Sequence, residues 1–203
     1  MKLYYMPGAC SLAPHVALRE AAIPFELERV GRDKKTESGD DYLTVNPKGA
    51  VPALKLDNGE VLTEAAVIQQ YIADKAPAKK LAPPAGTPER YRLHEWLNYI
   101  ASEVHKGIGQ LFNPAMPEEY KTAVKKSLAD RQLPFLEKAL NGKDYLLGQF
   151  SIADGYLFTV LNWTKIHKID LSGYPNISAF LQRMAERPTV QEAMKAEGLL
   201  KGA

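Results

Sequence analysis

The sequence has a single cysteine, Cys10, in 203 residues. One cysteine excludes an internal disulfide and is typical of proteins that work in a reducing compartment. Apolar runs are also short, and none approaches the roughly 20 residues of a membrane helix. Pro7-Gly8 breaks the first residues too early for the apolar core of a signal peptide. We therefore expect a cytoplasmic protein that does not use a membrane.

Net charge is small as well. The 26 lysines and arginines nearly balance the 24 aspartates and glutamates, which leaves +2. Such a balance argues against nucleic acid and against anionic membranes as partners, and we expect no bound metal. The chain shows no internal repeat or low-complexity tract, and its length suffices for one large domain or two smaller ones.

The first 76 residues alternate between short strand patterns and helix patterns. A strand is expected at residues 2–6, and a helix follows from residue 12 with Ser11 as its expected N-cap. Asp57-Asn58-Gly59 predicts a hairpin turn, because an Asn-Gly pair between alternating residues is a strong hairpin signal. The remaining strands and the final helix of this part are expected at residues 25–30, 53–56, 60–62 and 64–75. The order predicts a mixed sheet covered by helices.

Residues 77–88 contain four prolines and a glycine, which marks the best domain boundary. Beyond it the pattern is helical, with one apolar stripe along a long helix: Leu93, Leu97, Ile100, Val104, Ile108 and Leu111. Further helices fit residues 118–140, 152–167, 176–186 and 189–197, and Ser151 with Asp154 has the spacing of a capping box. We expect an α/β domain at residues 1–78 and an all-α domain at residues 88–203.

Cys10 is the first candidate for chemistry. It follows a strand and precedes a helix, where backbone N–H groups and the helix dipole favour an anion, so we expect the pKa of its thiol below the ordinary value. The alternative is a buried cysteine that acts as a small apolar side chain. Because no second cysteine lies nearby, redox chemistry would have to run through a mixed disulfide with an external thiol.

Two further segments offer binding groups to a peptide. The Val51-Pro52 bond precedes a strand and is a candidate for the cis form, although a simple turn proline is the commoner outcome. In that form the backbone of Val51 would pair with a peptide ligand as a strand does. Glu64 opens a helix whose first N–H groups suit a carboxylate, while its own charge suits an ammonium. Either feature taken singly also fits a purely structural role.

Taken together, these features resemble the thioredoxin-like domain of cytosolic glutathione transferases, and further segments sharpen the resemblance to the bacterial beta class. The segments are Pro7-Gly8-Ala9-Cys10-Ser11-Leu12, Asn46-Pro47-Lys48-Gly49-Ala50-Val51-Pro52, Trp96-Leu97-Asn98-Tyr99, Ser102-Glu103-Val104-His105-Lys106-Gly107, Ser151-Ile152-Ala153-Asp154-Gly155-Tyr156-Leu157-Phe158 and Met184-Ala185-Glu186-Arg187-Pro188. The resemblance runs along the whole chain. It implies a thioredoxin-like domain with a mixed four-stranded sheet, followed by an all-α domain.

The resemblance also implies roles for residues of the first domain. Cys10 would contact the sulfur of glutathione, and the Val51-Pro52 segment would pair with its cysteinyl part. Glu64 and the N–H of Ala65 would hold the γ-glutamyl group, although many family members have a serine where this chain has Ala65. Lys34, or else Lys35, would meet the glycyl carboxylate, and the hydroxyl of Ser11 would donate to the thiolate or merely cap its helix.

The long helix allows an independent check. On an α-helix Asn98, Ser102, His105 and Gly109 fall within about 60° of one another, and their sector lies roughly 120° from the centre of the apolar stripe. The resemblance implies that His105 faces the sulfur across the cleft as a hydrogen-bond donor or base; the alternative is a surface histidine. Trp163 is expected to wall the cleft, or else to be a core residue.

The predicted function is attack by the glutathione thiolate on small hydrophobic electrophiles, with glutathione-dependent reduction of disulfides or peroxides through Cys10 as a further option. The resemblance implies homodimers in which Asn98 or Glu103 reaches the site of the partner subunit. Two alternatives remain at this stage: a monothiol glutaredoxin-like oxidoreductase, and a non-catalytic ligand-binding protein on the same fold. The sequence does not name the electrophile.

Overall fold

The computed structural model describes residues 1–200 and divides the chain into two compact units. The first unit comprises Met1–Ala82 together with the residues from Arg187 onward, and the second comprises Pro83–Glu186. The expected helical domain of residues 88–203 differs from this division at its end, because helix α10 (Pro188–Ala196) packs against α1 (Leu12–Glu20) in the first unit. Within residues 1–200, no helix has the length and apolar character needed to span a membrane.

The first unit is built on a mixed four-stranded sheet with the order β2-β1-β3-β4. β1 and β2 are parallel, whereas β3 pairs antiparallel with both β1 and β4. Leu3 lies opposite Leu27 on one side and Leu54 on the other. The bounds are Lys2–Tyr5 for β1, Glu26–Arg29 for β2, Ala53–Lys55 for β3 and Val61–Thr63 for β4. The predicted mixed sheet is confirmed, including the hairpin, whose Gly59 has φ +89°.

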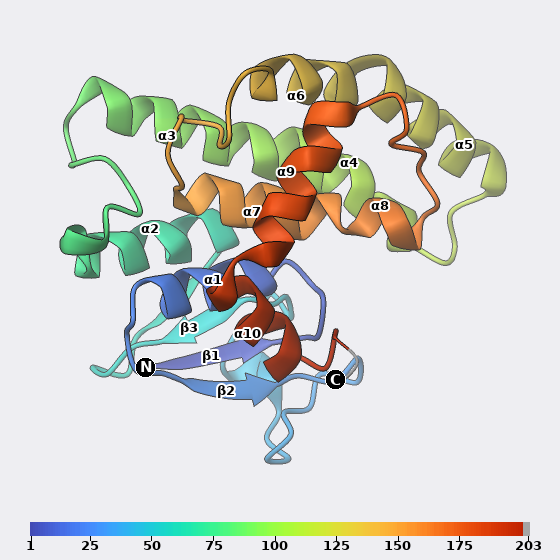
Figure 1. Ribbon diagram of the computed structural model, residues 1–203. Helices are drawn as coiled ribbons and strands as arrows, with labels where there is room; N and C mark the ends of the chain where they lie inside the picture. The colour runs from blue at the N-terminus through green and yellow to red at the C-terminus, as the bar shows by residue number, and fades with distance from the viewer. Residues whose placement is uncertain (201–203) are drawn as a thin grey trace. The chain divides into compact units, whose positions relative to one another are not determined.

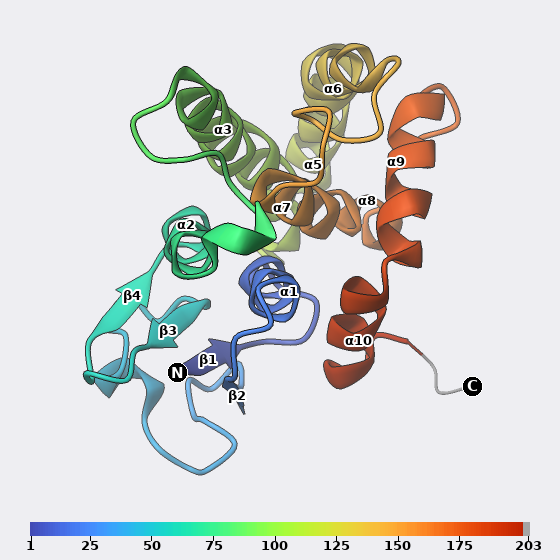
Figure 2. The ribbon, with the colours of Figure 1, turned by 60° about the vertical axis from the view of Figure 1, so that its left-hand side comes forward.

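Two helices lie side by side on one face of this sheet, α1 and α2 (Ala65–Lys75), as Figures 1 and 2 show. Both bury the apolar side that faces the strands, with Val16 and Ile68 almost wholly covered. The long connection from β2 to β3 contains the 3-10 turn η1 (Tyr42–Thr44) and two isolated β-bridges, and a second 3-10 turn, η2 (Pro77–Lys79), follows α2. Tyr42 is fully buried and packs with Tyr4 beside the sheet.

The second unit is all-helical among its described residues. Helix α7 lies at its centre, and all ten of its residues are buried, with α3 and α9 around it (Figure 2). The bounds are Pro88–Tyr99 for α3, Ile100–His105 for η3, Lys106–Gly109 for α4, Gln110–Phe112 for η4, Glu118–Ser127 for α5, Leu128–Gln132 for η5, Leu133–Leu140 for α6, Ile152–Leu161 for α7, Trp163–Ile166 for α8 and Pro175–Glu186 for α9.

The predicted apolar stripe of the long helix is confirmed, since all six of its members are buried. The helix is not a regular α-helix, however: η3 is a π-helical stretch that ends at His105, and η5 interrupts the predicted helix 118–140 in the same way. A π-helical turn contains more residues than an α-turn, so it rotates the residues beyond it. Side-chain directions near His105 therefore depart from those of a uniform α-helix.

The predicted capping box of α7 is confirmed. The carboxylate of Asp154 is buried and accepts hydrogen bonds from Ser151 N at 2.8 Å, Ser151 Oγ at 2.9 Å and Leu146 N at 2.9 Å. Burial raises the pKa of Asp154 to about 6, against the opposing effect of these donors. One carboxylate thus ties the helix start to the loop before it.

Candidate active site

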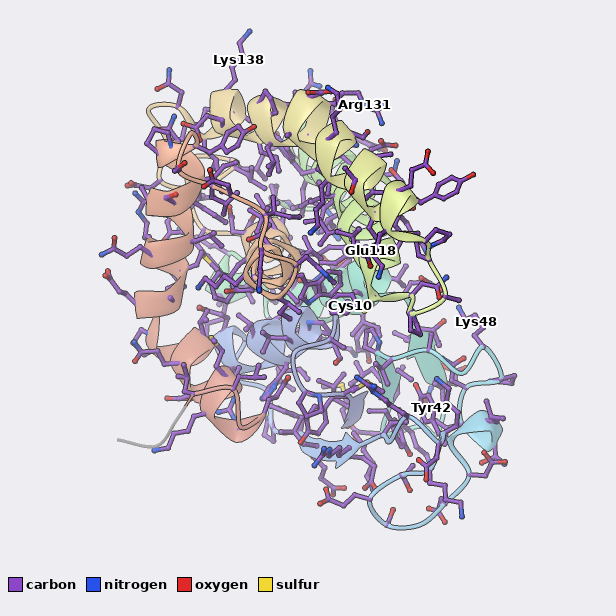
Figure 3. All side chains as sticks on the ribbon, turned by 90° about the vertical axis from the view of Figure 1, so that its right-hand side faces the viewer. Cys10, Tyr42, Lys48, Glu118, Arg131 and Lys138 are labelled. Atoms are coloured by element: carbon purple, nitrogen blue, oxygen red, sulfur yellow. The ribbon has the colours of Figure 1, made fainter. Side chains whose placement is uncertain are left out.

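Cys10 lies in the turn between β1 and α1, and its side chain is half-buried. Its Sγ donates a hydrogen bond to the carbonyl oxygen of Val51 at 3.3 Å, across 41 residues of sequence. The Val51-Pro52 peptide bond is cis. Figure 3 labels Cys10 among the side chains of the first unit. The structure therefore brings together the thiol and the backbone segment that the sequence had singled out separately.

The turn before Cys10 is closed by local hydrogen bonds. Ala9 N donates to Met6 O at 3.0 Å, and Gly8 has φ +71°, a conformation that suits glycine. Ser11 occupies the N-cap position of α1, but its hydroxyl does not cap the helix. It is fully buried, accepts from Met6 N and donates to Met6 O, each at 3.2 Å. Its hydroxyl thus stabilises the turn, and the structure does not bring it into an open site.

The segment that carries Val51 is held in place by three side chains. Tyr42 Oη and Asn46 Nδ2 both donate to Ala50 O, at 2.8 and 2.7 Å, and Lys34 Nζ donates to Gly49 O at 2.7 Å. Burial raises the pKa of Tyr42, whose phenol is therefore a neutral donor at neutral pH. These bonds fix the backbone next to the thiol before any ligand binds.

Glu64 marks the start of α2. Its backbone has φ +71° and ψ +118°, a region that side-chain-bearing residues rarely adopt and that is enriched at functional sites. Its exposed carboxylate pairs with Lys48 Nζ at 2.6 Å, and the same ammonium donates to Thr63 Oγ1 at 2.8 Å. Ala65 is buried at the first helical position, where the leading N–H groups have no helical carbonyl ahead of them.

The two lysines considered for the glycyl carboxylate differ in placement. Lys34 adopts the left-handed backbone conformation, φ +64°, and is half-buried against the loop that leads to Val51. The side chain of Lys35 is exposed, and its backbone N–H donates to Asp33 Oδ1. Of the two side chains, only that of Lys34 bonds to the Val51 loop.

In the second unit, His105 lies within an aromatic cluster. Its Nδ1 lies 2.7 Å from Tyr156 Oη, and its ring contacts the ring of Trp163, whose centroid lies 5.1 Å away. Phe112 packs on the other side of Trp163, at 5.4 Å between centroids. A side chain in place of Gly109 would meet both rings, since a Cβ there would lie 3.4 Å from His105 and 3.6 Å from Trp163. Trp163 is buried and is in direct contact with His105.

The other polar residues predicted on this helix lie elsewhere. Asn98 is exposed on α3. Ser102 and Glu103 line a groove of about 610 Å³ whose opposite wall comes from α5 and η5, with Tyr120 and Arg131 among its residues. His105 and Gly109 instead contact Trp163. Ser102 and His105 both lie in the π-helical stretch η3. That Asn98, Ser102, His105 and Gly109 share one sector stays a prediction.

Comparison with known proteins decides the family. The family model of the glutathione S-transferase N-terminal domain matches residues 8–75, and the family model of the C-terminal domain matches residues 99–188. The glutathione S-transferase GstA of Escherichia coli O157:H7 is 53% identical over 201 residues, which cover 98% of this chain and 100% of GstA. This chain belongs to the glutathione S-transferase family.

Solved structures of similar proteins refine this assignment. The beta-class glutathione S-transferase of Sphingomonas chungbukensis superposes with a TM-score of 0.95 at 49% identity. A sphingomonad glutathione S-transferase complexed with glutathione superposes with a TM-score of 0.94, also at 49% identity; each comparison covers 98% of this chain and 100% of the other. The predicted fold and the beta class are confirmed. As a glutathione S-transferase, the chain is an enzyme with glutathione as its co-substrate, and residues 1–200 contain no group of three or more potential metal ligands.

The sequence did not predict the contacts of several residues of this transferase. Lys48 lies within a segment that carries the family resemblance, but nothing in the sequence pointed to its pairing with Glu64. Tyr156 also lies in such a segment, and nothing in the sequence pointed to its contact with His105. His15 and Glu197 form a fully buried pair across 182 residues, and no local pattern announces such a contact. Only the fold brings these groups together.

Proposed function

We propose that this transferase conjugates the glutathione thiolate to small hydrophobic electrophiles at a site built around Cys10 and Val51. The observation that carries the proposal is the hydrogen bond from Cys10 Sγ to Val51 O. A peptide that pairs with the backbone of Val51 as an added strand would bring its own cysteinyl sulfur beside Cys10. Backbone N–H groups near the start of α1 would stabilise a thiolate there.

The ends of glutathione have matching partners in the same unit. The carboxylate of the γ-glutamyl group would accept from the N–H of Ala65 at the start of α2, where the helix dipole favours an anion, and its ammonium would meet Glu64. Lys48, which already holds the Glu64 side chain, would orient it. Lys34 would meet the glycyl carboxylate, because its ammonium lies beside the Val51 loop.

His105 is the second group that we propose to act on the sulfur, as a hydrogen-bond donor or base. Its Nδ1 lies 2.7 Å from Tyr156 Oη, a contact that orients the imidazole. Phe112 is exposed and packs edge to face on the buried Trp163, so its ring would supply the apolar surface that a hydrophobic electrophile needs. Electrophiles with an aromatic ring fit this surface best.

Cys10 also supports a reductive reaction. Its thiolate attacks the glutathione-side sulfur of a mixed disulfide RS–SG, which forms Cys10–S–SG and releases RS⁻, protonated to RSH. A second glutathione thiolate then attacks the bound sulfur, forms GS–SG and releases the Cys10 thiolate. The net reaction is RS–SG + GSH to RSH + GS–SG, so one glutathione thiol is oxidised for each R-thiol produced. This route needs no second cysteine, in agreement with the sequence.

We propose further that the enzyme works as a cytoplasmic homodimer. The single, half-buried Cys10 suits a reducing compartment. Asn98, Ser102 and Glu103 carry exposed polar side chains, and in a dimer they would contribute to the glutathione site of the partner subunit. Sedimentation at several concentrations would test this, and a monomer at micromolar concentration would contradict it.

Titration calorimetry with glutathione, followed by conjugation and disulfide-reduction assays, tests the proposed function. We expect binding of glutathione, conjugation with aryl halides and reduction of mixed disulfides. Reduction without conjugation would favour a glutaredoxin-like enzyme. Binding without turnover of aryl halides, epoxides, peroxides or disulfides would favour a ligand-binding protein instead.

Replacing Lys34 by alanine should raise the KM for glutathione by about 10-fold, the effect of losing one charge-assisted hydrogen bond, while kcat changes little. Steady-state kinetics with varied glutathione measure it. Lys35→Ala is the matched control, because its ammonium is exposed and makes no bond to the Val51 loop. An equal or larger effect of Lys35→Ala would assign the glycyl carboxylate to Lys35.

Replacing Ala65 by serine should lower the dissociation constant of glutathione about 2- to 10-fold, since the added hydroxyl supplies one more donor to the γ-glutamyl carboxylate. Ala66→Ser, one position further along α2, is the control for a general effect of serine on the helix. Calorimetry compares the two variants. Weaker binding by Ala65→Ser would show that this buried position has no room for the hydroxyl.

A further inference from the structure

The first unit contains a buried acid–histidine pair that the conjugation mechanism does not use. His15 lies on α1, and Glu197 follows the last residue of α10. Their side chains are both fully buried, and Nδ1 of the histidine lies 2.9 Å from Oε1 of the glutamate. A buried carboxylate is costly unless every oxygen is satisfied, so its remaining partners indicate its role.

Arg19 fixes which nitrogen of the His15 ring accepts a hydrogen bond. Its Nε donates to His15 Nε2 at 3.0 Å, one helical turn along α1. A guanidinium only donates, so Nε2 must be the unprotonated, accepting nitrogen. The ring proton is therefore on Nδ1, where it is donated to Glu197. The hydrogen bonds thus run in one direction, from Arg19 to the imidazole of His15 and from the imidazole to Glu197.

The second oxygen of Glu197 reaches the turn that presents the thiol. Gly8 N donates to Oε2 at 2.9 Å, two residues before Cys10. Leu199 covers the same glycine, since a Cβ on Gly8 would lie only 3.4 Å from its Cδ2. Glu197 also acts on β1, because its charge adds to burial in raising the pKa of Tyr5. The end of the chain thus holds and covers the Gly8 turn.

Helix α10 is fixed against α1 along its whole length, which places Glu197 reproducibly. Near the start of α10, Arg187 and Thr189 both donate to Glu20 Oε1. In its middle, Glu192 pairs with Arg19 at 3.0 Å. At its end, Glu197 meets His15, so the two helices run antiparallel; Figure 2 shows them side by side.

We propose that Glu197 is a positioning residue for Cys10, whose carboxylate holds the Gly8 turn and thereby keeps the thiol beside the backbone of Val51. A carboxylate is required, because two donors, Gly8 N–H and His15 Nδ1–H, converge on its two oxygens. In a glutamine side chain the NH₂ group would face one of these two donors, and that hydrogen bond would be lost. His15 cannot adapt by moving its proton, since Nε2 already accepts from Arg19. The consequence for turnover rests on the proposed function, whereas the effect on the thiol does not.

The test uses Glu197→Gln and the alkylation of Cys10 by iodoacetamide without glutathione, from about pH 6 to 10. We expect the plateau rate at high pH to rise about 2- to 10-fold, as for a turn that has lost one restraining hydrogen bond. The apparent pKa of the thiol should fall, because a nearby buried negative charge is removed. Amide hydrogen exchange of Gly8 should become faster as well. A plateau rate and a Gly8 exchange rate equal to those of the wild type would overturn the proposal.

Two controls separate positioning from loss of stability. Glu192→Gln removes an exposed partner of Arg19 on the same helix and should leave alkylation unchanged. Asp154→Asn destabilises the second unit and should also leave it unchanged. If Glu197→Gln does not fold, Leu199→Ala replaces it, with a smaller increase expected from uncovering Gly8. Equal rates for Leu199→Ala and Glu192→Gln would then overturn the proposal.

A change in alkylation is informative whether or not the enzyme conjugates. If Glu197→Gln alters the thiol while the wild-type protein turns over no electrophile, the positioning role stands and the proposed function fails. If the wild type conjugates and the thiol reacts in the variant as in the wild type, the proposed function stands and the positioning role fails. In the case that both are correct, kcat for disulfide reduction should fall in Glu197→Gln, while the KM for glutathione changes less.

Discussion

Replacing Cys10 by alanine should reduce the glutathione-dependent reduction of mixed disulfides by about 100-fold or more, because the variant cannot form the covalent intermediate. The protein has only this one cysteine, so no other side chain can replace the thiol. A coupled assay of oxidised glutathione formation measures the rate. Circular dichroism should show an unchanged fold, since the half-buried Cys10 contributes little to the core.

Conjugation should respond differently to the same substitution. The sulfur that attacks the electrophile belongs to glutathione, and the other residues that we propose to bind glutathione, Val51, Glu64 and His105, are unchanged in this variant. We therefore expect Cys10→Ala to keep about a tenth or more of the conjugation rate. Equal losses in both reactions would contradict the separation of roles. Cys10→Ser is the matched control, since it keeps a hydroxyl that can donate to Val51 O but cannot form a disulfide.

Replacing Asp154 by alanine should lower the free energy of unfolding by about 3 kcal/mol, because Leu146 N–H and Ser151 N–H lose their buried acceptor. For a chain of this size the midpoint of thermal unfolding should fall by about 6–12 °C. Urea unfolding and calorimetry measure both quantities. Asp130→Ala is the control, since that carboxylate is exposed and pairs only with Lys126 four residues away, which is worth about 0.5 kcal/mol.

The same carboxylate gives a stability that depends on pH. Burial raises the pKa of Asp154 to about 6 from 3.8, so the folded protein keeps this proton over a range in which the unfolded chain has lost it. The stability contributed by the group is therefore full below about pH 4, falls as pH rises to about 6 and is constant above that. The difference in unfolding free energy between wild type and Asp154→Asn should decrease over this range by up to about 3 kcal/mol. A difference that is independent of pH would contradict the raised pKa.

Local patterns predicted the elements of this fold well. Asn58-Gly59 indicated the hairpin, and the spacing of Leu93 to Leu111 indicated a core-facing helix, because both signals lie within a few residues of chain. Ser151 and Asp154 predicted the capping box of α7 for the same reason. The candidate thiol, Cys10, stood out because a strand and a helix flank it, and its proximity to Val51 followed only from the family resemblance.

Contacts between distant segments could not be predicted in this way. Nothing in residues 188–196 indicated that α10 would join the first unit, since an amphipathic pattern does not specify the surface on which a helix packs. The pairing of His15 with Glu197 depends on that docking, so it could not be predicted from the sequence either. The π-helical turn at η3 was not predicted, because the apolar stripe continues through it. Each miss concerns long-range packing or a change in helix geometry.

The discontinuity of the first unit has a consequence for how the enzyme is made. Its sheet and the turn around Cys10 precede the second unit in the chain, whereas Glu197, which accepts from Gly8 N, follows it. Domains that are contiguous in sequence can fold as they leave the ribosome, but this one waits for the whole second unit to be synthesised. A nascent chain therefore contains Cys10 before it contains Glu197, and under the proposed role of Glu197 we expect its thiol to react faster until α10 has docked.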